Sequence, residues 1–358
     1  MSGQVEFKGY AMTDASNWSD FKVVSFEPKK FEETDVEIAI THCGVCASDV
    51  HSLCQDWGQA RLPLIAGHEI VGKVTRVGSK VTGIKVGDRA GVGAQVSSCL
   101  QCRECSEDYE TYCQNLIWTY NHQYSDGIQT QGGYSTAIRA NERFVFPVPD
   151  GVSSADAASM FCGGLTVYSP LVSNGCGPGK RVGVVGIGGL GHYAILFAKA
   201  LGAEVYAFTH SASKDEDIKK MGADHIIHTS DPDFAKPYAR KLDIIISTRN
   251  EASSMPLSQF LSTLYVHGKF VAVGLPAAGD PFPAIQPTSF IRNGSFFGSS
   301  HLGSKKECVE MLKLAAEKNI KPWIEELPMK DVKKAVEGVK NGNAKYRYVL
   351  VQDLVPVA

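Results

Sequence analysis

Four cysteines lie close together in the first third of the chain, and four thiolates can bind a metal ion. A cluster with this spacing can surround one tetrahedral zinc ion and leave no open position for chemistry, so its role is to hold a loop together. Disulfide bonds, or a redox pair at two of these cysteines, are the alternatives, and neither requires four. We therefore predict a structural zinc lobe over residues 97–115, with the ligands Cys99, Cys102, Cys105 and Cys113.

A glycine-rich stretch has the spacing that binds the pyrophosphate of a dinucleotide. It follows an apolar run typical of a strand, and helical spacing of apolar residues continues after it to Leu201. In this context Gly186 permits the tight turn, Gly188 lets the backbone approach the phosphates, and Gly191 lets the helix pack against the strand. The helix N-terminus then adds free N–H groups. The predicted loop consists of Gly186, Ile187, Gly188, Gly189, Leu190 and Gly191.

The residues after the next expected strand, 204–208, indicate which dinucleotide binds. An NAD-binding unit usually has Asp or Glu there to accept from the ribose 2′-hydroxyl. This chain has no carboxylate at the decisive position and has Thr209, His210, Ser211 and Lys214 instead. Because hydroxyl, imidazole and ammonium groups suit a 2′-phosphate that a carboxylate would repel, we predict a preference for NADP(H).

A second metal site, this one catalytic, is indicated by residues that are scattered along the sequence. Cys46, His68 and Cys162 have the residue types of a zinc site in which three protein ligands leave a fourth position open. Their spacing alone does not bring them together, and an isolated buried cysteine is usually a small apolar side chain. Asp49 is a candidate to orient the histidine ligand by accepting from its ring.

Ser48 and His51 could move protons near this site. A hydroxyl and an imidazole three residues apart can form a proton relay near neutral pH. Taken alone, His51 is more often an ordinary exposed histidine. The relay is therefore a hypothesis that requires both side chains to lie beside the metal ligands.

The composition excludes several classes of protein. The chain has 358 residues, a formal net charge of −2 and 44% hydrophobic residues, which suits two globular domains and no nucleic-acid partner. It has no apolar run of about 18 residues that could span a membrane. Residues 1–6 lack a secretion signal, so we expect a cytoplasmic protein whose ten cysteines serve metal sites rather than disulfides. No chemistry is assigned to four of them, which are expected to be buried structural thiols: Cys43, Cys54, Cys176 and Cys308.

The expected elements change character near the middle of the chain. Up to about residue 155, short strands with glycine turns are typical of an antiparallel β-barrel. From residue 181 to about 275, strands alternate with helices, which predicts a doubly wound parallel sheet. Its expected strands are 181–186, 204–208, 225–228, 242–247 and 269–274. Helices at 307–318 and 332–340 and a strand at 346–352 follow.

Taken together, these motifs resemble the zinc-containing medium-chain alcohol dehydrogenases, and more narrowly their cinnamyl alcohol dehydrogenase branch with a microbial NADP-dependent character. The resemblance spans nearly the whole chain in the right order. It is carried by segments 43–51, 67–69, the four-cysteine lobe, 162–168 and 186–191. It implies a GroES-like β-barrel catalytic domain (1–155 and 298–358) and a Rossmann-type cofactor domain (156–297).

The resemblance also implies roles for single residues. Cys46, His68 and Cys162 would bind the catalytic zinc, and Glu69 would approach the metal when the fourth ligand leaves. Ser48 would take the alcohol proton and pass it through the cofactor ribose toward His51. The cofactor would also meet Thr166, Ser300, His301 and Leu302. The sequence differs from close relatives at His210, where arginine is common, so the preference for NADP(H) is expected to be less strict.

The implied reaction is reversible hydride transfer between NADPH and an aldehyde whose oxygen sits on zinc. Trp57, Trp118, Tyr120 and His301 are candidate pocket walls that would favour aromatic or medium aliphatic aldehydes, although each could equally pack in the core. A polyol dehydrogenase or a specialised carbonyl or imine reductase on the same scaffold is the near alternative. A non-catalytic zinc and nucleotide binder is the distant one. Relatives imply a homodimer.

Overall fold

The computed structural model describes residues 6–355, and the chain divides into two compact units. The first unit comprises Met1–Gly163 and Gly303–Ala358, and the second comprises Gly164–Leu302. Each unit has its own buried hydrophobic cluster. The predicted boundaries, 155 and 298, lie several residues earlier. The expected absence of a secretion signal concerns residues that are, except for Glu6, outside the described part.

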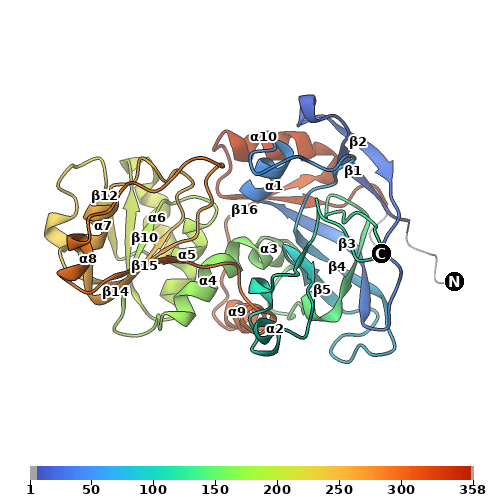
Figure 1. Cartoon of the computed structure of the whole chain (residues 1–358), viewed down its shortest axis with the longest axis horizontal. Helices are drawn as coiled ribbons and strands as arrows, with labels where there is room; N and C mark the ends of the chain where they lie inside the picture. The colour runs from blue at the N-terminus through green and yellow to red at the C-terminus, as the bar shows by residue number, and fades with distance from the viewer. Residues whose placement is uncertain (1–5, 356–358) are drawn as a thin grey trace. The chain divides into compact units, whose positions relative to one another are not determined.

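The first unit is built on a curved, mostly antiparallel sheet (Figure 1). The strand order is β16-β17-β3-β4-β5-β9, and β8 pairs with β3. Alternate residues of β3 and β4 face the core, among them Ile38, Ile70 and Val74. The strands are β3 (Asp35–Val45), β4 (Glu69–Val77), β5 (Arg89–Val92), β8 (Ala137–Asn141), β9 (Val145–Pro147), β16 (Ile324–Pro328) and β17 (Arg347–Val351).

Smaller elements surround this sheet. A hairpin of β1 (Lys8–Met12) and β2 (Phe21–Ser25) precedes it, and α1 (Ala47–Leu53) packs against α10 (Val332–Lys340). The cysteine lobe contains β6 (Gln95–Ser97), α2 (Arg103–Ser106), η2 (Glu110–Tyr112) and β7 (Ile117–Trp118). The remaining helices are η1 (Ala15–Asn17), η3 (Glu142–Phe144), α3 (Ser154–Ala158), η4 (Ser159–Phe161), α9 (Lys305–Glu317) and η7 (Met329–Asp331).

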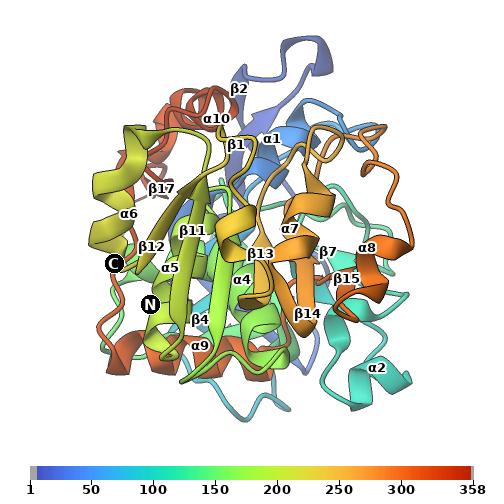
Figure 2. The same ribbon diagram turned by 90° about the vertical axis from the view of Figure 1, so that its left-hand side faces the viewer.

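The second unit is a six-stranded parallel sheet with helices around it (Figure 2). The order β12-β11-β10-β13-β14-β15 reverses between β10 and β13, and the glycine-rich loop follows β10 at this switch point, where dinucleotides bind in such folds. The strands are β10 (Arg181–Val185), β11 (Glu204–Thr209), β12 (His225–His228), β13 (Leu242–Ser247), β14 (Leu264–Ala272) and β15 (Phe296–Ser299). The helices are α4 (Gly163–Ser173), α5 (Gly191–Ala200), η5 (Ala212–Lys214), α6 (Asp215–Met221), η6 (Lys236–Tyr238), α7 (Leu257–Thr263) and α8 (Thr288–Ile291).

The predicted fold class is confirmed, and the differences are local. Sequence patterning does not anticipate β15, and it starts β14 five residues late. Among the four cysteines expected to be buried, Cys43 and Cys308 are, but Cys54 and Cys176 are only half-buried. Among the described residues, no helix has the length and apolar character needed to cross a membrane.

Candidate functional site

Three predicted ligands and one further acid meet in the core of the first unit. One ligand atom from each of Cys46, His68, Glu69 and Cys162 lies within 4.8 Å of the other three, and all four residues are buried. Cys46 follows the end of β3 and is the N-cap of α1, while His68 directly precedes β4 and Glu69 begins it. Cys162 lies between η4 and α4. Residues far apart in sequence are therefore brought together by the pairing of β3 with β4 and by the packing of the 154–163 segment on those strands.

Asp49 is fully buried and accepts four hydrogen bonds in this site. Its Oδ1 accepts from His68 Nδ1 at 2.8 Å and from the Gly67 backbone at 3.2 Å. Its Oδ2 accepts from the Cys46 backbone and from the Tyr134 hydroxyl, each at 2.9 Å. Because a carboxylate only accepts, His68 carries its proton on Nδ1, and Nε2 is left with a lone pair for a metal. The contact with Cys46 also completes a capping box that starts α1.

Glu69 is held by a buried arginine from the far end of the chain. Arg347 of β17 donates to Glu69 Oε1, which also accepts from the Gly163 backbone at 3.2 Å. The other oxygen, Oε2, is buried without a hydrogen-bond partner among the described residues. A Cβ on Gly44 would lie 2.1 Å from that oxygen, so only glycine leaves room for this carboxylate. Burial raises the pKa of Glu69 to about 7 against the opposing effect of Arg347.

The two cysteine sulfurs of this site shift each other's pKa in opposite directions. A hydrogen bond from Cys162 lowers the pKa of Cys46 well below its usual range, and the same contact raises the pKa of Cys162. Burial alone would lower the pKa of His68, but Asp49 raises it well above its ordinary value. Buried groups whose pKa values are shifted by one another in this way are typical of functional sites.

The donor set fits zinc. Two sulfurs and one imidazole nitrogen are ligands that zinc prefers in catalytic sites with an open position. One carboxylate oxygen of Glu69 lies within 4.8 Å of the other ligand atoms and could complete the coordination. Together these atoms can hold one divalent ion in the core of the first unit.

Ser48 and His51 lie on α1, the helix whose N-cap is Cys46. The Ser48 hydroxyl oxygen lies 3.7 Å from Cys46 Sγ. The His51 ring is bonded through Nδ1 to Asp56 Oδ2 at 2.7 Å and stacks on Trp57, with ring centroids 4.6 Å apart. The acid and the indole therefore fix the orientation of the imidazole, and they leave its Nε2 able to accept a proton.

The three predicted pocket aromatics occupy different surroundings. The Tyr120 ring lies 5.7 Å from the His68 ring and is 8% exposed, so it lines the metal site from within the core. Trp57 is 38% exposed beside His51. Trp118 lies on β7 and is half-buried.

The four-cysteine lobe has the geometry of a closed zinc site. Cys102 Sγ lies 3.4 Å from that of Cys105 and 3.8 Å from that of Cys113, and Cys113 Sγ lies 3.5 Å from that of Cys99. These separations are close to the roughly 3.8 Å expected between sulfurs of a tetrahedral site. Backbone N–H groups of Gln101 and Cys102 lower the pKa of Cys99 to about 6. All ten cysteines of the chain are free thiols, so the cluster can bind a metal.

The glycine-rich loop in the second unit has the expected shape. Gly186 adopts a φ of +84°, which favours glycine, and a Cβ on Gly191 would lie 2.0 Å from the Gly186 oxygen. A Cβ on Gly188 would meet nothing within 4 Å. The backbone is therefore open at Gly188, where a phosphate could approach, and closed at Gly191, where α5 meets β10.

The residues expected to meet the 2′-phosphate lie at the end of β11. Lys214 Nζ donates to the Ile187 carbonyl oxygen at 2.8 Å, which joins this cluster to the glycine-rich loop. The Ser211 hydroxyl lies 3.0 Å from that of Ser213, and Thr209 donates to the Ser211 carbonyl oxygen at 3.3 Å. His210 is exposed. The remaining predicted cofactor contacts are in the same unit: Thr166 on α4, and Ser300, His301 and Leu302 after β15.

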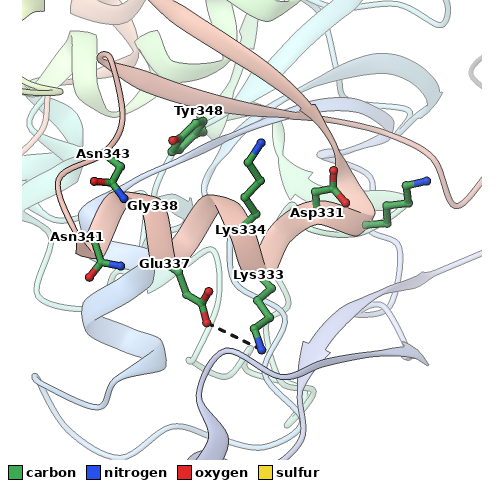
Figure 3. A pocket seen from close by; sticks show the side chains of 9 residues that line it. Asp331, Lys333, Lys334, Glu337, Gly338, Asn341, Asn343 and Tyr348 are labelled. Carbon is green, nitrogen blue, oxygen red and sulfur yellow. Dashed lines mark ion pairs between the residues drawn. The ribbon is translucent and has the colours of Figure 1, made fainter.

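One surface hollow of the first unit belongs to neither cysteine cluster. It has a volume of about 510 Å³ and lies along α10, where lysines alternate with acids and amides (Figure 3). Lys333 and Glu337 form an ion pair across it at 4.0 Å. Its open, mixed-charge lining contains no thiol or histidine, so it carries none of the chemistry described above.

Both halves of the chain match models of one enzyme family. Residues 32–150 match the alcohol dehydrogenase GroES-like domain, and residues 189–317 match the zinc-binding dehydrogenase model. The chain is 42% identical over 355 residues to NADP-dependent alcohol dehydrogenase 6 of Saccharomyces cerevisiae, covering 98% of each. The chain belongs to the zinc-binding alcohol dehydrogenase family.

Other members extend the comparison to solved structures. Cinnamyl alcohol dehydrogenase 2 of Arabidopsis thaliana is 41% identical over 91% of this chain and 86% of its own. The structure of a Sorghum bicolor cinnamyl alcohol dehydrogenase superposes with a TM-score of 0.91 at 35% identity, covering 98% of this chain and all of its own. The Helicobacter pylori enzyme in complex with NADP(H) gives 0.87 at 34%, covering 97% and 98%. These comparisons confirm the predicted family, the fold class and the assignment as an alcohol dehydrogenase.

Sequence reasoning missed three residues with clear positions in or beside these sites. Asp56 bonds to His51, Arg347 bonds to Glu69, and Glu110 ties the cysteine lobe to α9. The five-residue spacing of His51 and Asp56 could have suggested their pairing. Nothing in the sequence signals the partners of Arg347 and Glu110, since 278 and 195 residues separate them from those partners.

Proposed function

We propose that this chain is a zinc- and NADP(H)-dependent alcohol dehydrogenase that interconverts alcohols and aromatic or medium aliphatic aldehydes. The observation that carries the proposal is the meeting of Cys46, His68 and Cys162 beside the Ser48 hydroxyl, in a chain of this family. The names of relatives support the substrate class, because several are cinnamyl alcohol dehydrogenases and one is an NADP-dependent alcohol dehydrogenase.

The residues of the chain would bind both cofactors and move one proton. Zinc held by Cys46, His68 and Cys162 would polarise the carbonyl oxygen, and NADPH would supply the hydride. Ser48 would donate its proton to the oxygen of the reduced substrate and recover one through the imidazole of His51. Asp56, bonded to His51 Nδ1 at 2.7 Å, would stabilise the ring when it is protonated.

The cofactor choice rests on the cluster at the end of β11. We assign the 2′-phosphate to Thr209, His210, Ser211 and Lys214. The Lys214 ammonium is fixed there by the Ile187 carbonyl oxygen, and the hydroxyl groups of Thr209 and Ser211 lie at the same end of β11. The pyrophosphate would lie on the backbone from Gly186 to Gly191. Two relatives are NADP proteins by name, which supports the same choice.

An assay of NADPH oxidation with cinnamaldehyde and benzaldehyde, paired with zinc analysis, tests the proposal. We expect turnover, two zinc ions per chain, and a loss of turnover without loss of zinc in Ser48→Ala. Polyols and cyclic imines are assayed beside the aldehydes, since a polyol dehydrogenase or a specialised carbonyl or imine reductase would share both cysteine sites. A protein that binds zinc and NADPH but reduces no carbonyl compound would contradict the proposal and favour a non-catalytic binder.

We also propose a cytoplasmic homodimer. Ten free thiols suit a reducing compartment. The edge of the second unit supports self-association, because β15 has a neighbour on one side only and its Phe296 is 58% exposed, with Ile291 nearby in sequence at 76%. Light scattering of wild type and of Phe296→Lys tests this, with a dimer and a monomer as the respective expectations. A monomeric wild type would exclude the dimer.

A further inference from the structure

A buried acid in the cysteine lobe, Glu110, is fixed through its backbone to the metal site. Glu110 lies three residues before Cys113, whose backbone N–H donates to the Glu110 carbonyl oxygen at 3.3 Å. The side-chain amide of Gln95 on β6 donates to the same oxygen at 3.0 Å. The position of Glu110 therefore depends on how the lobe holds Cys113.

The side chain of Glu110 reaches out of the lobe and binds the start of α9. Its Oε1 accepts from the Lys305 backbone N–H at 2.7 Å, and its Oε2 accepts from Arg143 at 3.0 Å. Lys305 is the first residue of α9, and its N–H has no partner within the helix. The carboxylate is only 2% exposed, so the N–H it accepts from is shielded from water and would lose its acceptor if the acid moved.

The start of α9 is also the place where the chain returns to the first unit. Leu302 ends the second unit and Lys305 follows three residues later. Leu302 adopts a φ of +55°, a left-handed conformation that a leucine keeps only when its neighbours hold it. The segment 300–302 is one that we expect to meet the cofactor. The bond from Glu110 thus fixes the chain directly after that segment.

We propose that Glu110 is a positioning residue that couples the four-cysteine lobe to cofactor binding through the start of α9. With the lobe closed on its metal, Glu110 holds Lys305 and thereby the backbone of segment 300–304. Opening of the lobe frees Cys113, displaces Glu110 and releases that segment. The lobe then supports the cofactor-binding segment as well as its own loop. This inference rests on the proposed function.

The variant Glu110→Gln tests the coupling, with Glu107→Gln as the matched control. Glutamine keeps the size of the side chain but turns an amide toward Arg143 or toward the Lys305 N–H. Glu107 lies on the same lobe, 47% exposed, in an ion pair with Arg103. If glutamine destabilises the fold, Arg143→Gln removes the other partner and leaves the carboxylate in place.

Four measurements are made on the zinc-loaded, full-length protein. They are hydrogen exchange of the 298–307 backbone without cofactor, the rate of zinc release to a colorimetric chelator, the dissociation constant of NADPH from fluorescence, and steady-state kinetics. In Glu110→Gln we expect zinc release from one site and exchange over 298–307 to accelerate roughly tenfold, the scale of one lost charge-assisted hydrogen bond. The dissociation constant and KM of NADPH should rise severalfold, while kcat at saturating NADPH stays within about twofold of wild type. Glu107→Gln should match wild type throughout.

The outcomes separate this inference from the proposed function. Unchanged exchange over 298–307 in Glu110→Gln would overturn the anchor. Faster exchange and zinc release with an unchanged NADPH dissociation constant would overturn the coupling. If wild type itself bound no NADPH, the proposed function and the coupling would both fail, while the exchange data would still decide whether Glu110 anchors α9.

Discussion

Replacing Asp49 by asparagine should weaken zinc binding at the catalytic site and leave the zinc affinity of the four-cysteine lobe unchanged. The carboxylate accepts four hydrogen bonds, two on each oxygen. Asparagine keeps one oxygen, so two of the four donors would face an amide that cannot accept. Loss of the partner that orients a histidine ligand typically costs about 10–100-fold in metal affinity. We expect that loss at this site, because His68 would no longer be fixed with Nε2 toward the metal.

The assay is a competition titration with a zinc chelator, read against total zinc per chain. Asp49→Asn should show one site at wild-type affinity and one weakened by the stated factor, with kcat/KM falling in proportion to occupancy. Tyr134→Phe is the graded control, since it removes one of the four donors and leaves the carboxylate bonded to His68, so its loss of zinc affinity should be smaller than that of Asp49→Asn. The reasoning is refuted if Asp49→Asn retains two zinc ions at wild-type affinity, or if Tyr134→Phe loses more zinc than Asp49→Asn does.

Three other expectations follow from the same geometry. Asp56→Ala should lower kcat about tenfold with zinc content unchanged, because His51 loses the partner that orients it; a KM effect alone in steady-state kinetics would argue against the relay. The double variant Ser211→Ala, Lys214→Ala should weaken NADPH use about tenfold or more and leave NADH use nearly unchanged; equal losses with both cofactors would mean that the phosphate is misplaced. Gly188→Ala should melt within a few degrees of wild type, since its Cβ meets no protein atom, yet bind NADPH weakly in a fluorescence titration; wild-type binding would exclude a close approach of the phosphate there.

The glycine-rich loop shows why part of the structure can be predicted from the sequence. The strand, turn and helix around Gly186 and Gly191 are encoded by adjacent residues, so local pattern suffices, and β10, β12 and β13 lie within a residue of their expected bounds. The four cysteines of the lobe are close neighbours for the same reason. In both cases the chemistry and the chain contacts are local.

The cluster at the proposed catalytic zinc site depends on contacts between distant residues, which the sequence does not encode locally. Cys46, His68 and Cys162 meet only because β3 pairs with β4 and the 154–163 segment packs on both, and no spacing encodes that. Family resemblance suggested those three residues as ligands, but it did not suggest Arg347. A long-range partner of this kind provides the hydrogen bond that a buried polar group requires. The sequence alone does not show which polar groups are buried, so it cannot predict such a partner.

The division of the chain places all four residues of the catalytic cluster, Cys46 to Cys162, in the first unit. The chain passes from the first unit to the second between Gly163 and Gly164, and it returns to the first unit between Leu302 and Gly303. The two junctions, each of which contains glycine, are the points at which a graft would be spliced. A chimaera that exchanges residues 164–302 for those of an NAD-using homologue would inherit an intact metal centre, provided that Cys162, two positions upstream of the splice, is retained. We expect such a chimaera to change its coenzyme preference and to keep its metal centre.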